Sequence, residues 1–272
     1  MNDQEFAYLK NRILKLTNLN LDGYKEQQIR RRLDVYLERT ARLNVYEFSQ
    51  ALARDPARRR ELIDYLAINV SEFFRDPNQF SYLKTDVLPE LKKNRSRLNI
   101  WSAACSCGQE PYSLAMYLED ISCAYHILAT DIDTSALDKA GKGGPYTDQD
   151  IRNIDARYLK MYFNHDSSGY WVKRTLAKNI TFKMHNIQSD LFSKGYDLIV
   201  CRNVIIYFSE AIRDIIFRKF HESLNPGGIL FIGGSEAILH PEKIGFKTMR
   251  PSYYIKPQAD RITPQMPVLE RR

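Results

Sequence analysis

The 272-residue sequence lacks an apolar run of the roughly 20 residues that a membrane-spanning helix needs. Its first twelve residues mix charged, polar and single apolar side chains, and they contain neither the apolar core nor the cleavage site of a signal peptide. These absences argue against a membrane-embedded or exported protein. We therefore expect a soluble, cytoplasmic protein.

Cysteine is also scarce, with only Cys105, Cys107, Cys123 and Cys201 in the sequence. Cys105 and Cys107 form a C-x-C pair, but neither a histidine nor a second cysteine pair follows at the spacing of a zinc site. The sequence therefore predicts no metal site. Reduced and mostly buried thiols are the expected state.

Negative charge is in deficit, because 40 lysine and arginine residues outnumber 33 aspartate and glutamate residues and give a net charge of +7. A basic excess favours an acidic partner. Nucleic acid, an anionic membrane surface and an acidic protein all fit that description. Charge alone therefore leaves the partner open.

Residues 1–68 have the pattern of an all-helical N-terminal domain. Asn44 and Glu47 have the spacing of a capping box at a helix start. Pro56 follows Asp55 and fits another start, because proline is tolerated in the first helical turn. The segment 25–40 predicts a helix with one apolar stripe, formed by Ile29, Leu33, Tyr36 and Leu37.

Residues 69–257 change to alternating strands and helices, with helical patterns at 111–118 and 210–224. This alternation is typical of an α/β domain whose parallel sheet is covered on both faces. The predicted strands are Leu98–Ser102, His126–Asp131, Ile180–Met184, Asp197–Cys201 and Ile229–Ile232.

Two further segments depart from this alternation. A polar turn at Asp166–Gly169 separates strand-like runs, and we interpret about 158–186 as a small antiparallel β-subdomain inserted into the α/β domain. Residues 258–272 contain prolines and charges without periodicity, which predicts a disordered tail.

The segment 100–113 has the features of a nucleotide-type site. It follows a predicted strand, opens a helix and is rich in small residues that let a ligand approach the backbone. Asp131 lies 23 positions after Gly108, at the end of the next strand, where doubly wound folds place the acceptor for ribose hydroxyls. The loop lacks the G-x-G-x-x-G pattern, which disfavours a pyrophosphate dinucleotide.

Glu110 indicates the charge of the ligand. A carboxylate at a helix start would repel a phosphate but attract the ammonium and sulfonium groups of S-adenosyl-L-methionine. Each acid also has a simpler interpretation. Glu110 fits a favourable charge on the helix dipole, and Asp131 fits a solvated acid at a strand end.

Four stretches, in their order and spacing, resemble the CheR family of chemotaxis receptor methyltransferases: Asn69–Arg75, Trp101–Ser113, Ala129–Asp133 and Cys201–Phe208. The resemblance extends over about residues 5–257. It implies a Rossmann-like, class I S-adenosyl-L-methionine-dependent methyltransferase domain that follows an all-α domain. It also implies an enzyme that methylates glutamate side chains of chemotaxis receptors, supports sensory adaptation and releases S-adenosyl-L-homocysteine.

The resemblance also implies which residues bind the cofactor. In the family, Glu110 matches the residue at the amino end of the cofactor and Asp131 the residue at its ribose, while Asn186 and Ile187 match positions beside the adenine. The full set of matching positions is Asn69, Ser71, Arg75, Glu110, Asp131, Asn186, Ile187, Arg202 and Asn203.

Arg75 and Tyr207 match the residues that face the substrate carboxylate and the transferring methyl group, so they are the predicted catalytic residues. From the sequence alone, Tyr207 also fits a packed tyrosine, and Arg75 fits an ion pair with Asp76. Some positions depart from the family pattern. Ser71 replaces a commoner Thr but keeps the hydroxyl, and Gln109 replaces a commoner acid, a change that can soften cofactor affinity. The loop also carries Ala104 and Cys107 where Gly and Thr are usual.

The implied reaction needs no general base, because a glutamate with a pKa of about 4.3 is already ionised at neutral pH. This agrees with the motif set, which contains no His/Asp or Cys/His arrangement. Positioning and desolvation then supply the rate. An arginine can hold the substrate carboxylate without losing its own charge.

Lys25, Arg32 and Arg39 recur every seven residues and share a helix face opposite the apolar stripe. The resemblance implies that the partner is the cytoplasmic helical bundle of methyl-accepting chemotaxis receptors. A basic helix face would steer the encounter of the enzyme with this acidic bundle. A merely solvated basic face fits equally. We expect a monomer without nucleic-acid binding or membrane insertion. In the family, the inserted subdomain can bind the C-terminal peptide of a receptor. The short connection at 166–169 favours an enzyme that works without binding such a peptide.

Two other functions remain open at this point. A nucleic-acid methyltransferase would suit the positive charge, but it calls for an Asn/Asp-Pro-Pro-aromatic tetrapeptide, absent here, or a catalytic cysteine motif. A non-catalytic module of the same fold could sense S-adenosyl-L-methionine. The presence of Arg75, Glu110, Asp131 and Tyr207 argues against it.

Overall fold

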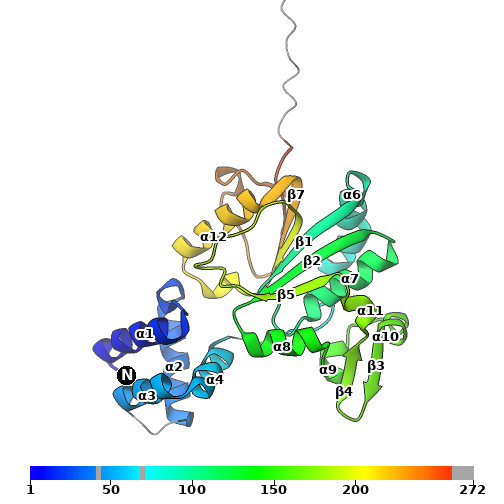
Figure 1. Ribbon diagram of the computed structural model, residues 1–272. Helices are drawn as coiled ribbons and strands as arrows, with labels where there is room; N and C mark the ends of the chain where they lie inside the picture. Colours follow the sequence, from blue (N-terminus) through cyan, green and yellow to red (C-terminus); the bar gives the residue numbers. More distant parts are fainter. Residues whose placement is uncertain (41–43, 68–70, 259–272) are drawn as a thin grey trace, which may run out of the picture.

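The structure, a computed structural model, describes residues 1–40, 44–67 and 71–258. Asn69 and the part of the expected tail from residue 259 onward lie outside the described residues. A helical bundle and an α/β domain lie side by side (Figure 1). Across the described ranges, no helix combines the length and the apolar character needed to cross a membrane.

The N-terminal part is the predicted helical bundle. The expected capping box is confirmed: the Asn44 side chain accepts from the Glu47 N–H, and the Glu47 carboxylate accepts from the Asn44 N–H, both at 3.0 Å. Asp55 caps the next helix, with Pro56 in its first turn. The elements are α1 (Asp3–Thr17), η1 (Leu21–Gly23), α2 (Glu26–Thr40), α3 (Val45–Arg54) and α4 (Pro56–Leu66).

The predicted apolar stripe holds this bundle together. Ile29, Leu33 and Tyr36 of α2 are buried, and Leu37 packs partly buried against the same cluster. Full burial of such a side chain stabilises the fold by about 1.5–3 kcal/mol. The apolar stripe predicted from the sequence is therefore the face of α2 that packs against the rest of the bundle.

The second part is a mixed sheet with the strand order β5-β2-β1-β6-β7-β9-β8 in the described residues. The strands from β5 to β7 are parallel, whereas β9 is antiparallel to both of its neighbours. The strands are β1 (Arg97–Ala103), β2 (Ala124–Asp131), β5 (Ile180–Met184), β6 (Tyr196–Cys201), β7 (Leu224–Ile232), β8 (Lys247–Arg250) and β9 (Tyr253–Ile255).

Helices cover both faces of this sheet (Figure 1), as the alternating pattern predicted. Alternation along β1 divides the core, because Ile100 joins the cluster on one face and Trp101 the cluster on the other. The connecting elements are α5 (Pro77–Tyr82), η2 (Leu83–Val87), α6 (Leu88–Lys93), α7 (Gln109–Asp120), α8 (Thr134–Lys142), α9 (Asp148–Ile151), α10 (Ala156–Tyr162), α11 (Arg174–Ala177), η3 (Ile205–Tyr207), α12 (Glu210–Ser223) and η4 (Pro241–Lys243).

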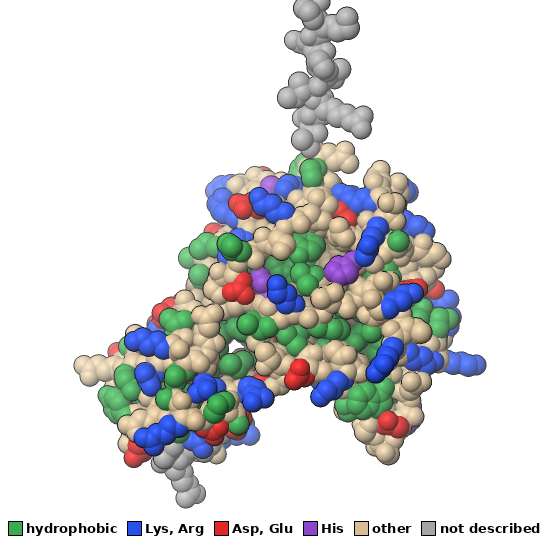
Figure 2. Space-filling view, viewed as in Figure 1, with side chains coloured by type: hydrophobic (Ala, Val, Ile, Leu, Met, Phe, Trp, Pro, Cys, Tyr) green, Lys and Arg blue, Asp and Glu red, His purple; other side chains and the backbone are tan. Residues whose placement is uncertain are grey.

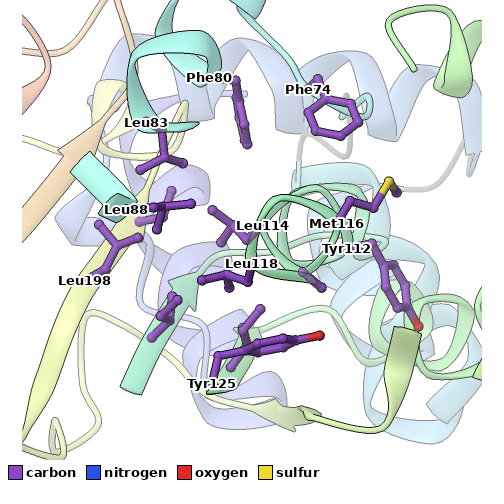
Figure 3. Packing of buried hydrophobic residues seen from close by; sticks show 14 of the residues in the cluster. Phe74, Phe80, Leu83, Leu88, Tyr112, Leu114, Met116, Leu118, Tyr125 and Leu198 are labelled. Carbon is purple, nitrogen blue, oxygen red and sulfur yellow. The ribbon is translucent and has the colours of Figure 1, made fainter. Parts of the chain in front are cut away.

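Helix α7 is the centre of the larger core cluster. Figure 3 shows its side chains Leu114 and Leu118 lying among Leu88 of α6 and Leu198 of β6, with Phe74 nearby. This packing fixes α7 against the sheet. The start of α7 is therefore held rigidly beside the end of β1.

The insertion is smaller than the predicted range of about 158–186. Only β3 (Phe163–Asp166) and β4 (Gly169–Val172) form the antiparallel pair, and β5 instead joins the edge of the main sheet beside β2. The pair projects from the α/β domain on the side away from the helical bundle (Figure 1). Tyr146 adds a bridge to Tyr170 on the other edge of β4.

The sheet topology places a crevice at the ends of three strands. Strand β1 has β2 on one side and β6 on the other, with Ile100 opposite both Ile127 and Leu198. The chain therefore reverses its direction of progress between β1 and β6, and such a switch point is where open α/β sheets bind ligands.

Candidate functional site

A cavity of about 470 Å³ lies at this switch point and extends to the helical domain. Figure 2 shows a hollow where the helical domain meets the α/β domain. The structure brings together every described residue that the sequence predicted for the site. Those lining the cavity are Ser71, Arg75, Glu110, Asp131, Asn186, Ile187, Arg202, Asn203 and Tyr207.

The loop after β1 reaches the cavity through unusual backbone geometry. Ala104, Ser106 and Gly108 all have positive φ, at 62°, 48° and 89°. Glycine is required at 108 because an added Cβ would lie 2.8 Å from the Cβ of Ala140. The tight loop therefore sets the N-terminus of α7 directly beside the cavity.

Glu110 extends from the first turn of α7 with only 12% of its side chain exposed. Ser102 Oγ donates to Glu110 Oε1 at 2.8 Å, and Arg202 Nη1 lies 3.7 Å from Glu110 Oε2. Burial raises the pKa of the Glu110 carboxyl, while Arg202 and the Ser102 hydrogen bond oppose that shift. A cationic ligand group would compensate for the burial of this carboxylate.

Asp131 ends β2 and is also buried. Its two oxygens accept the N–H groups of Ser106 at 2.7 Å and Asp133 at 2.9 Å. Burial raises the pKa of the Asp131 carboxyl, and these backbone hydrogen bonds oppose the shift. Each carboxylate oxygen has two acceptor sites, so Asp131 retains capacity for ligand hydroxyls.

Arg75 sits on a strained turn that Arg202 holds in place. Its neighbours Phe74 and Asp76 have φ values of 50° and 59°, which are unfavourable for residues other than glycine. Arg202 Nη2 donates to the Arg75 carbonyl at 2.9 Å and to Asp76 Oδ2 at 2.6 Å. The Arg75 charge also opposes the rise in the pKa of the Glu110 carboxyl that burial causes, and both side chains line the cavity.

Arg202 itself is almost fully buried, with 2% of its side chain exposed. Its guanidinium lies over the rings of Phe80 and Phe231, at 5.1 and 4.8 Å from their centroids. The sequence predicted Arg202 as a cofactor-binding residue. The structure places it at the cavity wall, where its described bonds anchor the turn that carries Arg75.

The loop after β6 is organised by Glu236, a residue that no motif in the sequence singled out. Its buried carboxylate accepts four backbone N–H groups from the loop after β6 and one from the residue that follows β7. The donors and distances are Asn203 (3.0 Å), Val204 (3.1 Å), Ile205 (2.8 Å), Ile206 (3.3 Å) and Gly233 (2.6 Å). The sequence contained one hint of this role: Glu236 is a carboxylate shortly after β7, and β7 lies next to β6 in the sheet. Tyr207 follows directly in this fixed loop.

Asn186 and Ile187 form the wall beyond β5, and both are buried. Asn186 Oδ1 accepts the Gln188 N–H at 3.0 Å, and its Nδ2 donates to the Asn18 carbonyl at 3.3 Å. The Asn186 side chain thus links the α/β domain to the helical domain. Ile187 presents apolar surface to the cavity.

Gln109, which departs from the family pattern, is not among the cavity-lining residues. Its Nε2 donates to Asp150 Oδ1 at 3.0 Å and to the Ser71 carbonyl at 3.4 Å. An acid in its place would face the Asp150 carboxylate. Any effect of Gln109 on the cavity therefore passes through the segment that carries Ser71.

The helical domain supplies a wall of the cavity that the sequence did not predict. Lys25 N–H donates to the Tyr207 carbonyl and Ser209 N–H to the Gly23 carbonyl, both at 2.9 Å. Arg32 is half-buried, not on an open face as expected, because it donates to the Tyr65 carbonyl and lies over the Tyr65 ring. The lining residues of this wall are Tyr24, Gln28, Ile29, Arg31, Arg32, Val35, Tyr65, Leu66 and Ala67.

The Rossmann-like sheet has a cavity at its switch point, with one carboxylate at the end of β2 and another in the first turn of α7, and this is the architecture of the class I S-adenosyl-L-methionine-dependent methyltransferases. A family model described as "CheR methyltransferase, SAM binding domain" matches residues 69–255. The chain belongs to this CheR methyltransferase family, as the resemblance in the sequence predicted.

Individual relatives are similar over most of the chain. A "Chemotaxis protein methyltransferase" of Listeria monocytogenes is 38% identical over 257 residues, which cover 93% of this chain and 98% of the relative. "Chemotaxis protein methyltransferase 1" of Pseudomonas aeruginosa is 35% identical and covers 82% of this chain and 86% of its own. The solved structure of the S-adenosylmethionine-dependent methyltransferase SibL aligns with 56% of this chain and 34% of its own, at 13% identity and a TM-score of 0.36.

Proposed function

We propose that the protein transfers the methyl group of S-adenosyl-L-methionine to glutamate carboxylates of chemotaxis receptors, forming methyl esters. One observation carries this proposal. Glu110 and Arg75 face the same cavity as electrostatic neighbours, so a carboxylate for a cationic donor lies beside a guanidinium for an anionic acceptor. The names of the relatives support the same reaction.

Each residue has a role that its position supports. S-adenosyl-L-methionine, when bound, supplies a methyl group on a positively charged sulfur. Glu110 holds the amino end of this donor, Asp131 the ribose, and Asn186 and Ile187 flank the adenine. The start of α7 and the end of β2 keep the two acids fixed, so little reorganisation is needed on binding.

Arg75 orients the substrate carboxylate, and Tyr207 lies where a hydroxyl can guide it. A carboxylate that is already ionised needs no proton removed, so no residue acts as a base. Arg202 keeps the turn of Arg75 in place from behind. The helical domain excludes water from one side of the cavity, which strengthens the attraction between opposite charges.

The alternatives are less well supported. A nucleic-acid methyltransferase would not be expected from relatives named for chemotaxis, and the basic charge also suits acidic receptor helices. A sensor without turnover would not need an arginine on a strained turn at the cavity. Family membership and the position of Arg75 favour the enzyme.

The reaction is tested with methyl-labelled S-adenosyl-L-methionine and membranes that carry chemotaxis receptors. Carboxyl methyl esters release labelled methanol when treated with alkali, whereas methyl groups on nitrogen or carbon stay attached. We expect volatile label that depends on both receptor and enzyme. Label that resists alkali, or label on nucleic acid, would refute the proposed reaction.

We further propose that the face of α2 beside the cavity docks the receptor. Lys25, which directly precedes α2, and Arg39, near the end of α2, are exposed, and Arg32 between them borders the cavity. A basic face next to the site would steer acidic receptor helices toward it. Lys25→Glu with Arg39→Glu should slow receptor methylation at low salt. The matched control is Lys243→Glu with Lys247→Glu, which changes the net charge equally at two exposed lysines on η4 and β8. Equal rates for all three proteins would contradict this docking face.

A further inference from the structure

Tyr24 belongs to the helical domain but reaches into the site. It lies between η1 and α2 and lines the cavity. Its backbone forms an antiparallel bridge to Phe208, and the two rings meet edge to face at 4.9 Å. The hydrogen bonds from Lys25 to Tyr207 and from Ser209 to Gly23 flank this bridge, so Tyr24 is fixed beside the loop that carries Tyr207.

The hydroxyl of Tyr24 is available to a ligand. The side chain is partly buried on the cavity wall, and none of the hydrogen bonds found among the described residues involves this hydroxyl. Burial, together with the nearby Asp131 carboxylate, raises the pKa of Tyr24. The hydroxyl therefore stays protonated at physiological pH and can act as a donor. Buried tyrosine hydroxyls usually find a partner.

We propose that Tyr24 is a cofactor-binding residue, whose hydroxyl donates to the ribose end of S-adenosyl-L-methionine beside Asp131. This inference rests on the proposed function, since it assumes the same ligand. It makes the helical domain part of the cofactor site. Because the Tyr24 segment pairs with Tyr207–Ser209, cofactor binding and docking of the helical domain stabilise each other, as linkage requires.

The test is equilibrium binding of S-adenosyl-L-homocysteine to the full chain by calorimetry. Tyr24→Phe keeps the ring against Phe208 and removes only the hydroxyl, so it should weaken binding about three- to tenfold. The matched control is Tyr8→Phe, which removes a hydroxyl bonded to Ser49 at 2.9 Å elsewhere in the helical domain. The control should bind as the unmodified protein does.

A second ligand locates the contact. 5′-Methylthioadenosine lacks the amino-acid end, so Tyr24→Phe should weaken its binding by the same factor, whereas Glu110→Gln should weaken only S-adenosyl-L-homocysteine. Equal affinity of Tyr24→Phe and the unmodified protein for both ligands would overturn the role of Tyr24. Failure of the unmodified protein to bind S-adenosyl-L-homocysteine would instead overturn the proposed function itself.

The proposed linkage has its own readout in hydrogen exchange. Ligand should protect the amides of Lys25 and Ser209 in the unmodified protein, because both close the pairing around Tyr24. In Tyr24→Phe this added protection should fall, even at saturating ligand. Undiminished protection in the variant would contradict the link between the cofactor and the helical domain.

Discussion

At the scale of single residues, the site depends on charged side chains that have little exposure to solvent. Glu110 and Asp131 are buried carboxylates whose pKa values burial raises, and Arg202 is a buried guanidinium that anchors its neighbours. Arg75 occupies a turn with positive φ on both sides. Such a turn persists only where the surrounding contacts hold it, which is typical of a functional position.

Replacing Arg75 by Ala should lower kcat for receptor methylation about 100-fold, because the substrate carboxylate loses its orienting partner. Binding of S-adenosyl-L-homocysteine, measured by calorimetry, should change less than about tenfold. Arg75→Lys should recover only part of the rate, since an ammonium lacks the bidentate fork of a guanidinium. A normal kcat in Arg75→Ala would exclude this role.

The raised pKa of the Glu110 carboxyl predicts that cofactor binding depends on pH. Burial raises the pKa of this carboxyl, so the carboxylate is lost on acidification at a higher pH than for an ordinary glutamate. Affinity for S-adenosyl-L-methionine should therefore fall on acidification, starting at a higher pH than the titration of an ordinary glutamate would give. Glu110→Gln should bind about tenfold more weakly at pH 7 and show a flatter profile. Identical profiles for both proteins would contradict the assigned role.

The sequence predicted these acids because each follows directly from its place in a strand–loop–helix pattern. Residues that act through distant contacts escaped it. Tyr24 and Glu236 carry no local motif, and their positions become meaningful only once η1 meets η3 and β7 lies beside β6. The hydrogen bonds from Arg202 to Arg75 and Asp76 could not be predicted either, because these residues are far apart in the sequence. Asn69 stays a prediction, because it lies outside the described residues.

At the scale of elements, short loops with fixed backbones carry the site. The loop after β6 is held by the Glu236 carboxylate, which accepts several backbone N–H groups. Glu236→Gln replaces one acceptor oxygen by an NH₂ group facing those donors. The free energy of unfolding should fall by about 2–4 kcal/mol, as measured by urea denaturation.

The matched control for this change is Glu242→Gln, an exposed carboxylate on η4 with 67% of its side chain accessible. Its effect should stay within about 0.5 kcal/mol. Methylation by Glu236→Gln should also fall under conditions where the variant remains folded, because Tyr207 loses its fixed loop. Equal stability of the two variants would show that Glu236 does not organise this loop.

Most elements were predictable because their apolar periodicity is strong. The strands β1, β2 and β6 and the helix α12 appear close to their expected ranges, whereas β7 begins at Leu224, five residues before the expected Ile229. Strands β8 and β9 were missed, since β8 is exposed at every position and β9 has three residues. Strand β5 fitted both the main sheet and the inserted subdomain, and only its pairing with β2 shows that it belongs to the main sheet.

At the scale of the whole molecule, two domains share one cavity, and their contact contains a pair of acids. Asp64 on α4 interacts with Asp133, which caps α8. Burial and the Asp133 carboxylate raise the pKa of Asp64 to about 6. The arrangement of domains could not be predicted from the sequence, because no local pattern specifies which surfaces of two folded units meet.

This pair predicts a pH-dependent stability. A carboxyl whose pKa is raised on folding stabilises the folded state when protonated, and that contribution is lost as the pH rises from about 4 through 6. Asp64→Asn should therefore gain stability relative to the unmodified protein over this range, by about 1 kcal/mol after solvent screening. Thermal unfolding at pH 4.5 and 7.5 measures the change.

The exposed Asp214 on α12 offers a control, since Asp214→Asn removes a carboxylate without a described ion pair. The same measurement on Asp214→Asn gives the baseline against which the Asp64→Asn difference is judged. A constant difference for Asp64→Asn across the same range would mean that the acids at the domain contact do not repel each other.

We expect the cavity at the switch point to bind the methyl donor through Glu110 and Asp131. A crystal structure of the full chain with S-adenosyl-L-homocysteine tests it most directly. The expected result is density in this cavity, with the ligand amino group on the Glu110 carboxylate and the ribose hydroxyls on the Asp131 carboxylate. Ligand bound elsewhere, or a saturated crystal in which both acids contact only water, would contradict it.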